Sequence, residues 1–297
     1  MGPLLPGATL GWSLLLACGS TLSNDLFLDD ADFAAALPSG EHLALSYPVP
    51  DQGVAEDPAD LYTITVNTLG LGGAILDLTT GATAQVLAAP PTERGLDYRV
   101  WGPLPWDENP DWFLRVEMTR SSTGGTYAYA FAVAETSAGP WWEFLEGQHE
   151  VGEQEVALGE GTVWWRNLLG EGEVEIGYDL RETATISAEV RALDLGEGSI
   201  DQQWTWTEEV DGGGRLFQAQ PADAVPALRG GSDEELTVES RWLSDGTGRA
   251  DAWLSGGDLY GATVQLSQCW MATGAATWSW DNQGWTDQVG ESGACGL

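Results

Sequence analysis

Tryptophan residues two positions apart are the side chains in this sequence best placed to hold a ligand. Trp204 and Trp206 form one such pair, and Trp278 and Trp280 form another. Residues at this spacing point to the same face of a β-strand, so each pair of indole rings could stack on a sugar or line an apolar cavity. The alternative is that the rings fill the core, and the spacing itself is the same in both cases.

Three aspartates near glycine-rich turns are candidates for a calcium site. Asp245, Asp251 and Asp258 lie close together in the sequence, and calcium prefers several carboxylate and carbonyl oxygens at one point. Their spacing differs from that of an EF-hand, and Asp-Gly is also the ordinary chemistry of a hairpin turn. We therefore keep calcium as an alternative to structural turns and expect no other cofactor.

The groups that enzymes use most often are scarce. The chain has two histidines, His42 and His149, and no GxSxG, HExxH or phosphate-binding loop motif. Glycosidases need only two carboxylates, but 46 acidic residues guarantee such pairs in any fold, so their presence distinguishes nothing. We expect no enzymatic activity, with a carboxylate-based hydrolase as the remaining alternative.

The run Leu15-Leu16-Ala17-Cys18 resembles the lipobox of bacterial lipoproteins, in which a peptidase cuts before a lipid-bearing cysteine. Residues 1–17 carry no charged side chain, and their apolar run is too short and too broken to span a bilayer. The resemblance implies a signal peptide over residues 1–17 and a lipid anchor on Cys18. Gly19 in place of aspartate implies sorting to the outer membrane. The lack of a cation near the start departs from the usual pattern, and the alternative is a buried cysteine after an apolar first strand.

Two more cysteines lie near the C-terminus. If Cys18 carries lipid, Cys269 and Cys295 remain as a pair in an oxidising compartment. A bond between them would close about 25 residues and remove roughly 3 kcal/mol of unfolded-state entropy. It would also fasten the glycine- and serine-rich end of the chain to a strand. We therefore predict a disulfide.

The charge of the chain excludes several partners. Eleven basic residues, all arginine, stand against 46 acidic ones, and the formal net charge is −35. Such a surface repels the phosphates of nucleic acids and the headgroups of anionic lipids. We expect no nucleic-acid partner and no attachment to membranes through basic residues. Solubility is the simplest reason for the charge.

One long helix is the first element that positions these side chains. Apolar residues recur three and four positions apart from Leu61 to Leu78, on a face wide enough for a largely buried helix over about residues 59–87. Gly70, Gly72 and Gly73 each lower helix propensity by roughly 1 kcal/mol, which only close packing would offset. The sequence therefore predicts a helix held tightly against another element.

The remaining boundaries follow from composition. Residues 18–58 are rich in Asp, Pro, Ser and Gly and predict a flexible acidic tether with one short helix near Asp30–Leu37. After residue 90 the chain has no repeat of fixed period and no linker. Residues 59–297 therefore predict a single domain.

Strands and turns account for the rest of that domain. Large side chains alternate with alanines over residues 127–133, which is typical of a two-faced sheet. Short glycine-rich turns between strands imply antiparallel pairing. Strands are expected at 112–120, 127–133, 141–149, 162–166, 173–178, 183–192, 202–209, 214–219, 235–243, 249–255, 262–270 and 275–281. The fold class is therefore mainly β, with a large curved antiparallel sheet or open barrel of about 10–12 strands packed on the helix.

Several motifs resemble those of predicted outer-membrane lipoproteins of myxobacteria and their relatives. The shared stretches, over about residues 60–297, are Ala89-Pro90-Pro91, Arg99-Val100-Trp101-Gly102-Pro103, Thr126-Tyr127-Ala128-Tyr129, Gly177-Tyr178-Asp179, the run from Ser240 to Asp251, Ser255-Gly256-Gly257-Asp258, Cys269-Trp270 and Ala294-Cys295. Gln268 and Met271 depart from the acidic residues that relatives tend to show beside the Cys-Trp pair. The resemblance implies an envelope location, one domain and the disulfide, and it implies no activity.

These features predict a membrane-anchored lipoprotein of the bacterial cell envelope with a non-enzymatic binding role. A curved sheet holding a helix suits an apolar ligand or lipid, as in periplasmic carriers of similar shape, and this expectation rests on analogy between folds. One alternative is a structural or surface protein of the envelope without a small ligand. The other is a carbohydrate-binding module that uses the tryptophan pairs.

Overall fold

The computed structural model describes residues 22–48, 54–107, 109–153, 155–168, 172–194, 199–222, 234–284 and 289–295. The helices are α1 (Leu22–Ala35), α2 (Asp60–Leu87) and the short 3-10 helices η1 (Gly257–Leu259) and η2 (Ser292–Ala294). The strands are β1 (Glu93–Arg94), β2 (Tyr98–Trp106), β3 (Asn109–Arg120), β4 (Thr126–Ala134), β5 (Trp142–Glu150), β6 (Glu160–Leu168), β7 (Gly172–Asp179), β8 (Thr185–Asp194), β9 (Ser199–Glu208), β10 (Gly214–Ala222), β11 (Glu234–Trp242), β12 (Gly248–Gly256), β13 (Thr263–Trp270) and β14 (Ala276–Asp281).

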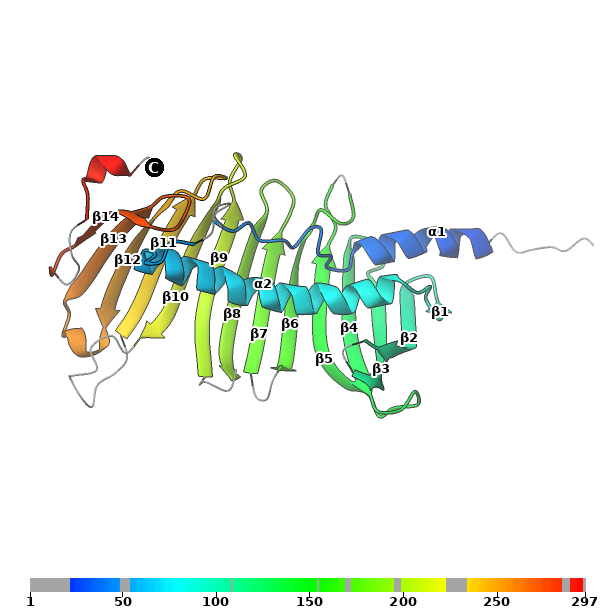
Figure 1. Cartoon of the computed structure of the whole chain (residues 1–297). Coiled ribbons are helices and arrows are strands. Elements are labelled where there is room, and N and C mark those ends of the chain that lie inside the picture. The colour runs from blue at the N-terminus through cyan, green and yellow to red at the C-terminus, as the bar shows by residue number, and fades with distance from the viewer. Residues whose placement is uncertain are drawn as a thin grey trace, which may run out of the picture.

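The strands form one antiparallel sheet in which each pairs with its neighbours in sequence, from β1 to β14 (Figure 1). The sheet does not close, and it packs on the long helix, so the predicted fold class of a curved antiparallel sheet or open barrel on one helix is confirmed. Its 14 strands exceed the number expected from the sequence. The sequence misses β1 and β2 because Gly102, Pro103 and Pro105 resemble a turn, whereas β2 continues through them with a shift in register between Trp101 and Leu104.

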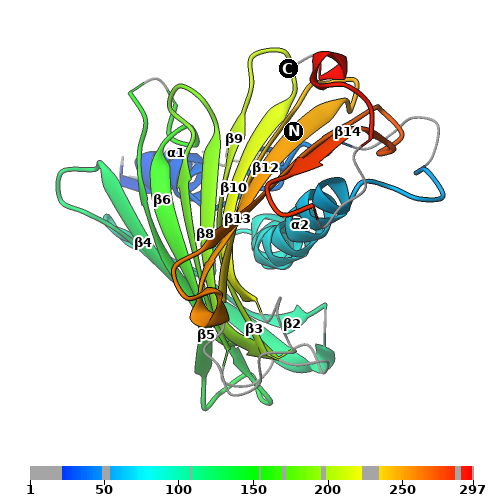
Figure 2. The same ribbon diagram turned by 90° about the vertical axis from the view of Figure 1, so that its left-hand side faces the viewer.

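Helix α2 crosses the strands on one face of the sheet, from β11–β13 near its start to β2 near its end (Figures 1 and 2). Its bounds confirm the predicted helix. Two of its glycines lie close to large side chains of other elements, as the sequence predicted. A Cβ atom on Gly72 would lie 2.7 Å from Cζ2 of Trp204, and one on Gly73 would meet the hydroxyl of Tyr47. The small residues therefore let the helix lie close to the side chains on both sides of it.

A line of polar contacts fastens α2 to the sheet. From the N-terminal end, these are the Leu61 amide to Gln268 Oε1 (2.8 Å), Thr65 Oγ1 with Ser240 Oγ (2.6 Å), Thr68 Oγ1 to Gln218 Oε1 (2.5 Å), and Trp165 Nε1 to Thr79 Oγ1 (2.8 Å). These contacts reach β13, β11, β10 and β6 in turn. They satisfy polar groups that would otherwise be buried without partners, and they fix where the helix sits on the sheet.

The face of the sheet that carries α2, called the inner face below, is filled by side chains. Buried aromatic and aliphatic residues from successive strands meet the helix in one large core, with a smaller cluster around Tyr62 and Trp270. Members of the large core include Val116, Phe131, Val163, Ile176, Ile186, Trp204, Leu216 and Trp242. By length and composition α2 also resembles a membrane-spanning helix, with a mean hydropathy of 1.2. In this fold the same apolar side chains pack on the sheet.

The segment predicted as a flexible tether is packed against the domain over residues 22–48, which corrects that expectation. Its helix is longer than the one expected near Asp30–Leu37 and begins earlier, at Leu22. Phe33 is fully buried, and Asp30 forms ion pairs with Arg94 (2.9 Å) and Arg99 (2.5 Å). Asp30 therefore binds arginines of β1 and β2 instead of remaining in solvent.

A disulfide joins Cys269 of β13 to Cys295 beyond η2, with their Cα atoms 5.7 Å apart. The predicted cysteine pairing is confirmed. The bond holds the C-terminal end against the sheet, on the face opposite to α2. Cys18 and the signal peptide expected over residues 1–17 lie outside the described residues.

Candidate functional site

The face of the sheet turned away from α2, called the outer face below, is where charged and polar side chains gather. Figure 2 shows α2 on one side of the strands and the opposite side bare. In β12 this produces strict alternation, with Ala250 and Ala252 buried toward the helix and Arg249 and Asp251 on the outer face. Antiparallel sheets commonly have one packed face and one solvated face. Any surface recognition by the sheet has to use the outer one.

Trp204 and Trp206 do not belong to that surface. Both are 2% exposed and lie in the core under α2. The expectation that they bind a ligand is therefore wrong, and their role is to fill the space between sheet and helix. The spacing correctly indicated that the two rings share a face, but it carried no information about which face.

Trp278 and Trp280 lie on the outer face of β14. Their register partners on β13 are Cys269 and Ser267, and Trp280 is 37% exposed. The guanidinium of Arg249 lies 5.6 Å from the Trp278 ring centroid. This second pair therefore remains a candidate aromatic platform, with the disulfide beside it.

Hydrogen-bonding groups flank the platform. Arg249 forms an ion pair with Asp251 (2.8 Å), and Ser267 donates a hydrogen bond from its hydroxyl to Oδ1 of Asp251 (2.5 Å). Burial alone would raise the pKa of Asp251, but hydrogen bonds from Arg249 and Ser267 outweigh it and lower the pKa. Asp251 is therefore a carboxylate near neutral pH, and in register it is separated from Trp280 by Ser267.

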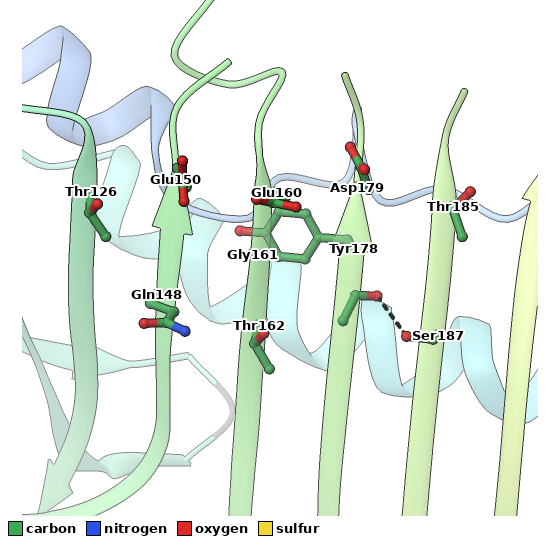
Figure 3. A pocket seen from close by; sticks show the side chains of 11 residues that line it. Thr126, Gln148, Glu150, Glu160, Gly161, Thr162, Tyr178, Asp179, Thr185 and Ser187 are labelled. Carbon is green, nitrogen blue, oxygen red and sulfur yellow. Dashed lines mark hydrogen bonds between the residues drawn. The ribbon is translucent and has the colours of Figure 1, made fainter. Parts of the chain in front are cut away.

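A polar groove of about 350 Å³ crosses the outer face of β4–β8 (Figure 3). Its floor is low where Gly177 has no side chain, between Thr162 of β6 and Ser187 of β8. Ser187 donates a hydrogen bond to the Gly177 carbonyl (3.4 Å). The other lining residues are Thr126, Gln148, Glu150, Glu160, Gly161, Tyr178, Asp179 and Thr185.

Three carboxylates stand side by side at the upper edge of this groove. Glu150, Glu160 and Asp179 are register partners on β5, β6 and β7, and Figure 3 shows them in one row. Arg181, in the loop after β7, forms exposed ion pairs with Glu160 (2.6 Å) and Asp179 (2.7 Å). Hydrogen bonding to Arg181 lowers the pKa of Asp179. Asp179 is therefore a carboxylate near neutral pH.

The structure does not gather the predicted calcium ligands. Asp245 accepts hydrogen bonds from the amide (2.9 Å) and hydroxyl (2.7 Å) of Thr247, as in an ordinary turn, while Asp251 is paired with Arg249. The side chain of Asp258 is outside the part that the structure describes. Within that part, no group of three or more His, Cys, Asp or Glu side chains could hold a metal ion. Calcium binding stays a prediction.

The two histidines are engaged with neighbouring residues. His149 is buried on the inner face, where its Nε2 contacts the Val156 carbonyl (2.5 Å) and its Nδ1 contacts the Tyr178 hydroxyl (3.1 Å). Burial lowers its pKa below the usual 6.5. His42 meets the Ser39 hydroxyl through Nδ1 (2.8 Å).

No protein-family model, no curated protein and no solved structure matches the chain. Function is therefore inferred from the geometry of the outer face. The sequence analysis did not predict the row of carboxylates on that face, because its residues belong to separate strands. Only strand register brings them into line.

Proposed function

We propose that this chain is a non-enzymatic, lipid-anchored binding module of the cell envelope that recognises carbohydrate at Trp278 and Trp280. The observation that supports a sugar ligand is the placement of two indoles on one outer strand face, beside the charged pair of Arg249 and Asp251. Indole faces stack on the apolar faces of sugar rings, and the neighbouring carboxylate and guanidinium can bond their hydroxyls.

The apolar-ligand alternative has less support. A lipid would have to enter between α2 and the inner face, but side chains of the large core fill that space. The glycines of α2 also bring the helix to contact distance from Trp204. The anchor on Cys18 and the outer-membrane location remain part of the proposal, and they rest on the lipobox resemblance.

Glycan binding by the full chain tests the proposal. A panel of neutral and acidic oligosaccharides is screened by glycan array, and positives are measured by quenching of tryptophan fluorescence. We expect Trp280→Ala to lower affinity at least tenfold. Trp142→Ala is the matched control, because Trp142 is 46% exposed but lies on β5, which is separated from β14 by the strands β6 to β13.

Two results would contradict the carbohydrate site. One is a wild-type chain that binds none of the panel. The other is binding that Trp280→Ala leaves unchanged, which would place the ligand elsewhere. Both variants are compared with wild type by thermal melting, so that loss of binding is not mistaken for loss of fold.

A further inference from the structure

Three of the eleven arginines of this acidic chain stand in one row on the outer face. Arg215 of β10 is the register partner of Arg241 of β11, which is the partner of Arg249 of β12. Arg241 forms no ion pair with any described residue, whereas Arg215 pairs with Glu209 and Arg249 with Asp251. Like charges directly opposite each other destabilise a sheet. With so few arginines available, composition does not account for this row.

The arginine row continues directly into the row of carboxylates. Register pairs connect Asp179 to Thr185, Thr185 to Thr207, and Thr207 to Arg215. From β5 to β12 the complete row is Glu150, Glu160, Asp179, Thr185, Thr207, Arg215, Arg241, Arg249. The centre of the row lies between Thr185 and Thr207. Three carboxylates lie beyond Thr185, and three arginines lie beyond Thr207.

This order is self-complementary, and from it we infer that the outer faces of two copies pack together in a symmetric dimer. A two-fold axis parallel to the strands, between β8 and β9, places β7 of one copy over β10 of the other. Each carboxylate then faces an arginine, with Asp179 opposite the partner's Arg215 and Glu160 opposite the partner's Arg241. Such an interface uses the same patch on both copies, as two-fold dimers do.

The neighbouring row fits the same axis. Gly177, Ser187, Thr205 and Phe217 are successive register partners on β7 to β10. The axis places Phe217 of one copy over Gly177 of the other, where the polar groove has its low floor. Phe217 is 44% exposed, which is costly for a large apolar side chain on a charged face. Docking into the groove would remove it from water.

The size of the patch is sufficient for a stable interface. Eight strands about 4.8 Å apart span roughly 34 Å, and strands of this length give a face of roughly 1,000 Å² per copy, which exceeds the ~800 Å² of standard interfaces. The sheet curves around α2, so its outer face is convex (Figure 2). The contacts near the axis, at Asp179 and Phe217, are therefore the closest, and the long side chains of Glu160 and Arg241 bridge farther out.

The arginine row favours this partner over a polyanion. A second copy carries the same net charge of −35 and is also repelled at long range, so the preference rests on geometry: it presents three carboxylates at the same inter-strand spacing as the three arginines. Arg181 competes for Glu160 and Asp179 in the single copy, but those pairs are exposed and contribute little. The interface leaves β14 uncovered and is argued from other observations than the carbohydrate proposal, although Arg249 of β12 belongs to both sites.

Charge reversal in the full chain tests the dimer. Mass is measured by sedimentation in a density-matched nonionic detergent, at low and high salt. We expect a dimer for wild type at both salt concentrations, because salt weakens the ion pairs between the copies but also screens the repulsion between two acidic chains. The variants Glu160→Arg and Arg241→Glu should each be monomeric. Each variant places like charges opposite each other at both of the symmetry-related contacts between residues 160 and 241. An equal mixture of the two variants should regain the dimer, since the mixed pair restores both contacts. Phe217→Ser should weaken association at least tenfold.

The control reverses a charge on the outer face outside the overlapping strands, at Arg115 of β3. Arg115→Glu should remain dimeric. We take the Kd of the dimer to be near 1 μM, so a protein concentration of 100 μM is roughly a hundredfold above it. A wild-type chain that is monomeric at 100 μM and low salt would overturn the inference. So would single reversals that stay dimeric, or a mixture that stays monomeric. A monomer that binds an acidic glycan through Arg241 would instead assign the row to that ligand.

Discussion

Thr65 of α2 and Ser240 of β11 meet through their hydroxyl oxygens at 2.6 Å, although 175 residues separate them in the sequence. Thr65 also donates to the Leu61 carbonyl within its own helix (2.7 Å). A hydroxyl has one proton, so Ser240 is the donor to Thr65. This buried pair joins the N-terminal part of the helix to the C-terminal half of the sheet.

Breaking that pair from either side should destabilise the fold. Thr65→Val leaves the Ser240 hydroxyl without its acceptor, and Ser240→Ala leaves Thr65 without its donor, so each should lower the free energy of unfolding by about 1–2 kcal/mol. Thr65→Val with Ser240→Ala should cost less than the sum, because both polar groups are removed together. Urea unfolding of the four proteins gives the coupling. Strict additivity would mean that the two hydroxyls do not interact.

Two glycines of α2 should respond oppositely to alanine. Gly72→Ala places a Cβ 2.7 Å from Trp204 and should destabilise by about 1–3 kcal/mol through overpacking. Gly70→Ala meets nothing within 4 Å and should stabilise by about 1 kcal/mol through helix propensity. Thermal melting distinguishes the two. A stabilising Gly72→Ala would show that the helix lies farther from the sheet.

Loss of the disulfide should lower stability without changing the fold. Cys269 and Cys295 are 26 residues apart, and opening a loop of that size should cost about 3 kcal/mol. Cys295→Ser and wild type in reductant should therefore melt at similar, lower temperatures. Cys18→Ser is the matched cysteine control and should melt like wild type. Equal melting of oxidised and reduced wild type would contradict a structural role.

Stability should depend on pH through His149. Its pKa is lowered in the fold, mainly by burial, so below about pH 6.5 the unfolded chain binds the proton more readily than the folded chain. The contribution of His149 to the free energy of unfolding is therefore fully present above about pH 6.5, and it decreases as the pH is lowered. Relative to His149→Gln, wild type should lose stability from pH 7 to 5. Parallel profiles for the two proteins would assign the pH dependence to other groups.

Membrane attachment should depend on one thiol. If Cys18 carries the lipid, Cys18→Ser should move the protein from the membrane fraction to the soluble fraction after cell lysis. Metabolic labelling with a fatty-acid analogue should mark wild type and not the variant. A variant that stays with the membrane and unlabelled wild type would both point to an anchor elsewhere in the chain.

The amino-acid sequence by itself determined the strands after β2, the long helix and the disulfide. Alternating side chains over residues 127–133 and glycine-rich turns are local signals, because period-two burial and tight reversals act on neighbouring residues. The wide apolar face from Leu61 to Leu78 is local in the same sense. These features predicted an antiparallel sheet on a helix, and the helix glycines predicted close packing.

Only the tertiary structure decided which face each side chain occupies. Trp204 with Trp206 and Trp278 with Trp280 have identical spacing, yet the first pair is buried under α2 and the second faces outward. Alternation places two residues on one face but does not say which face the helix covers. The charge rows from Glu150 to Arg249 likewise depend on register, which successive turns set across eight strands. Long-range packing and register therefore decided where recognition can occur.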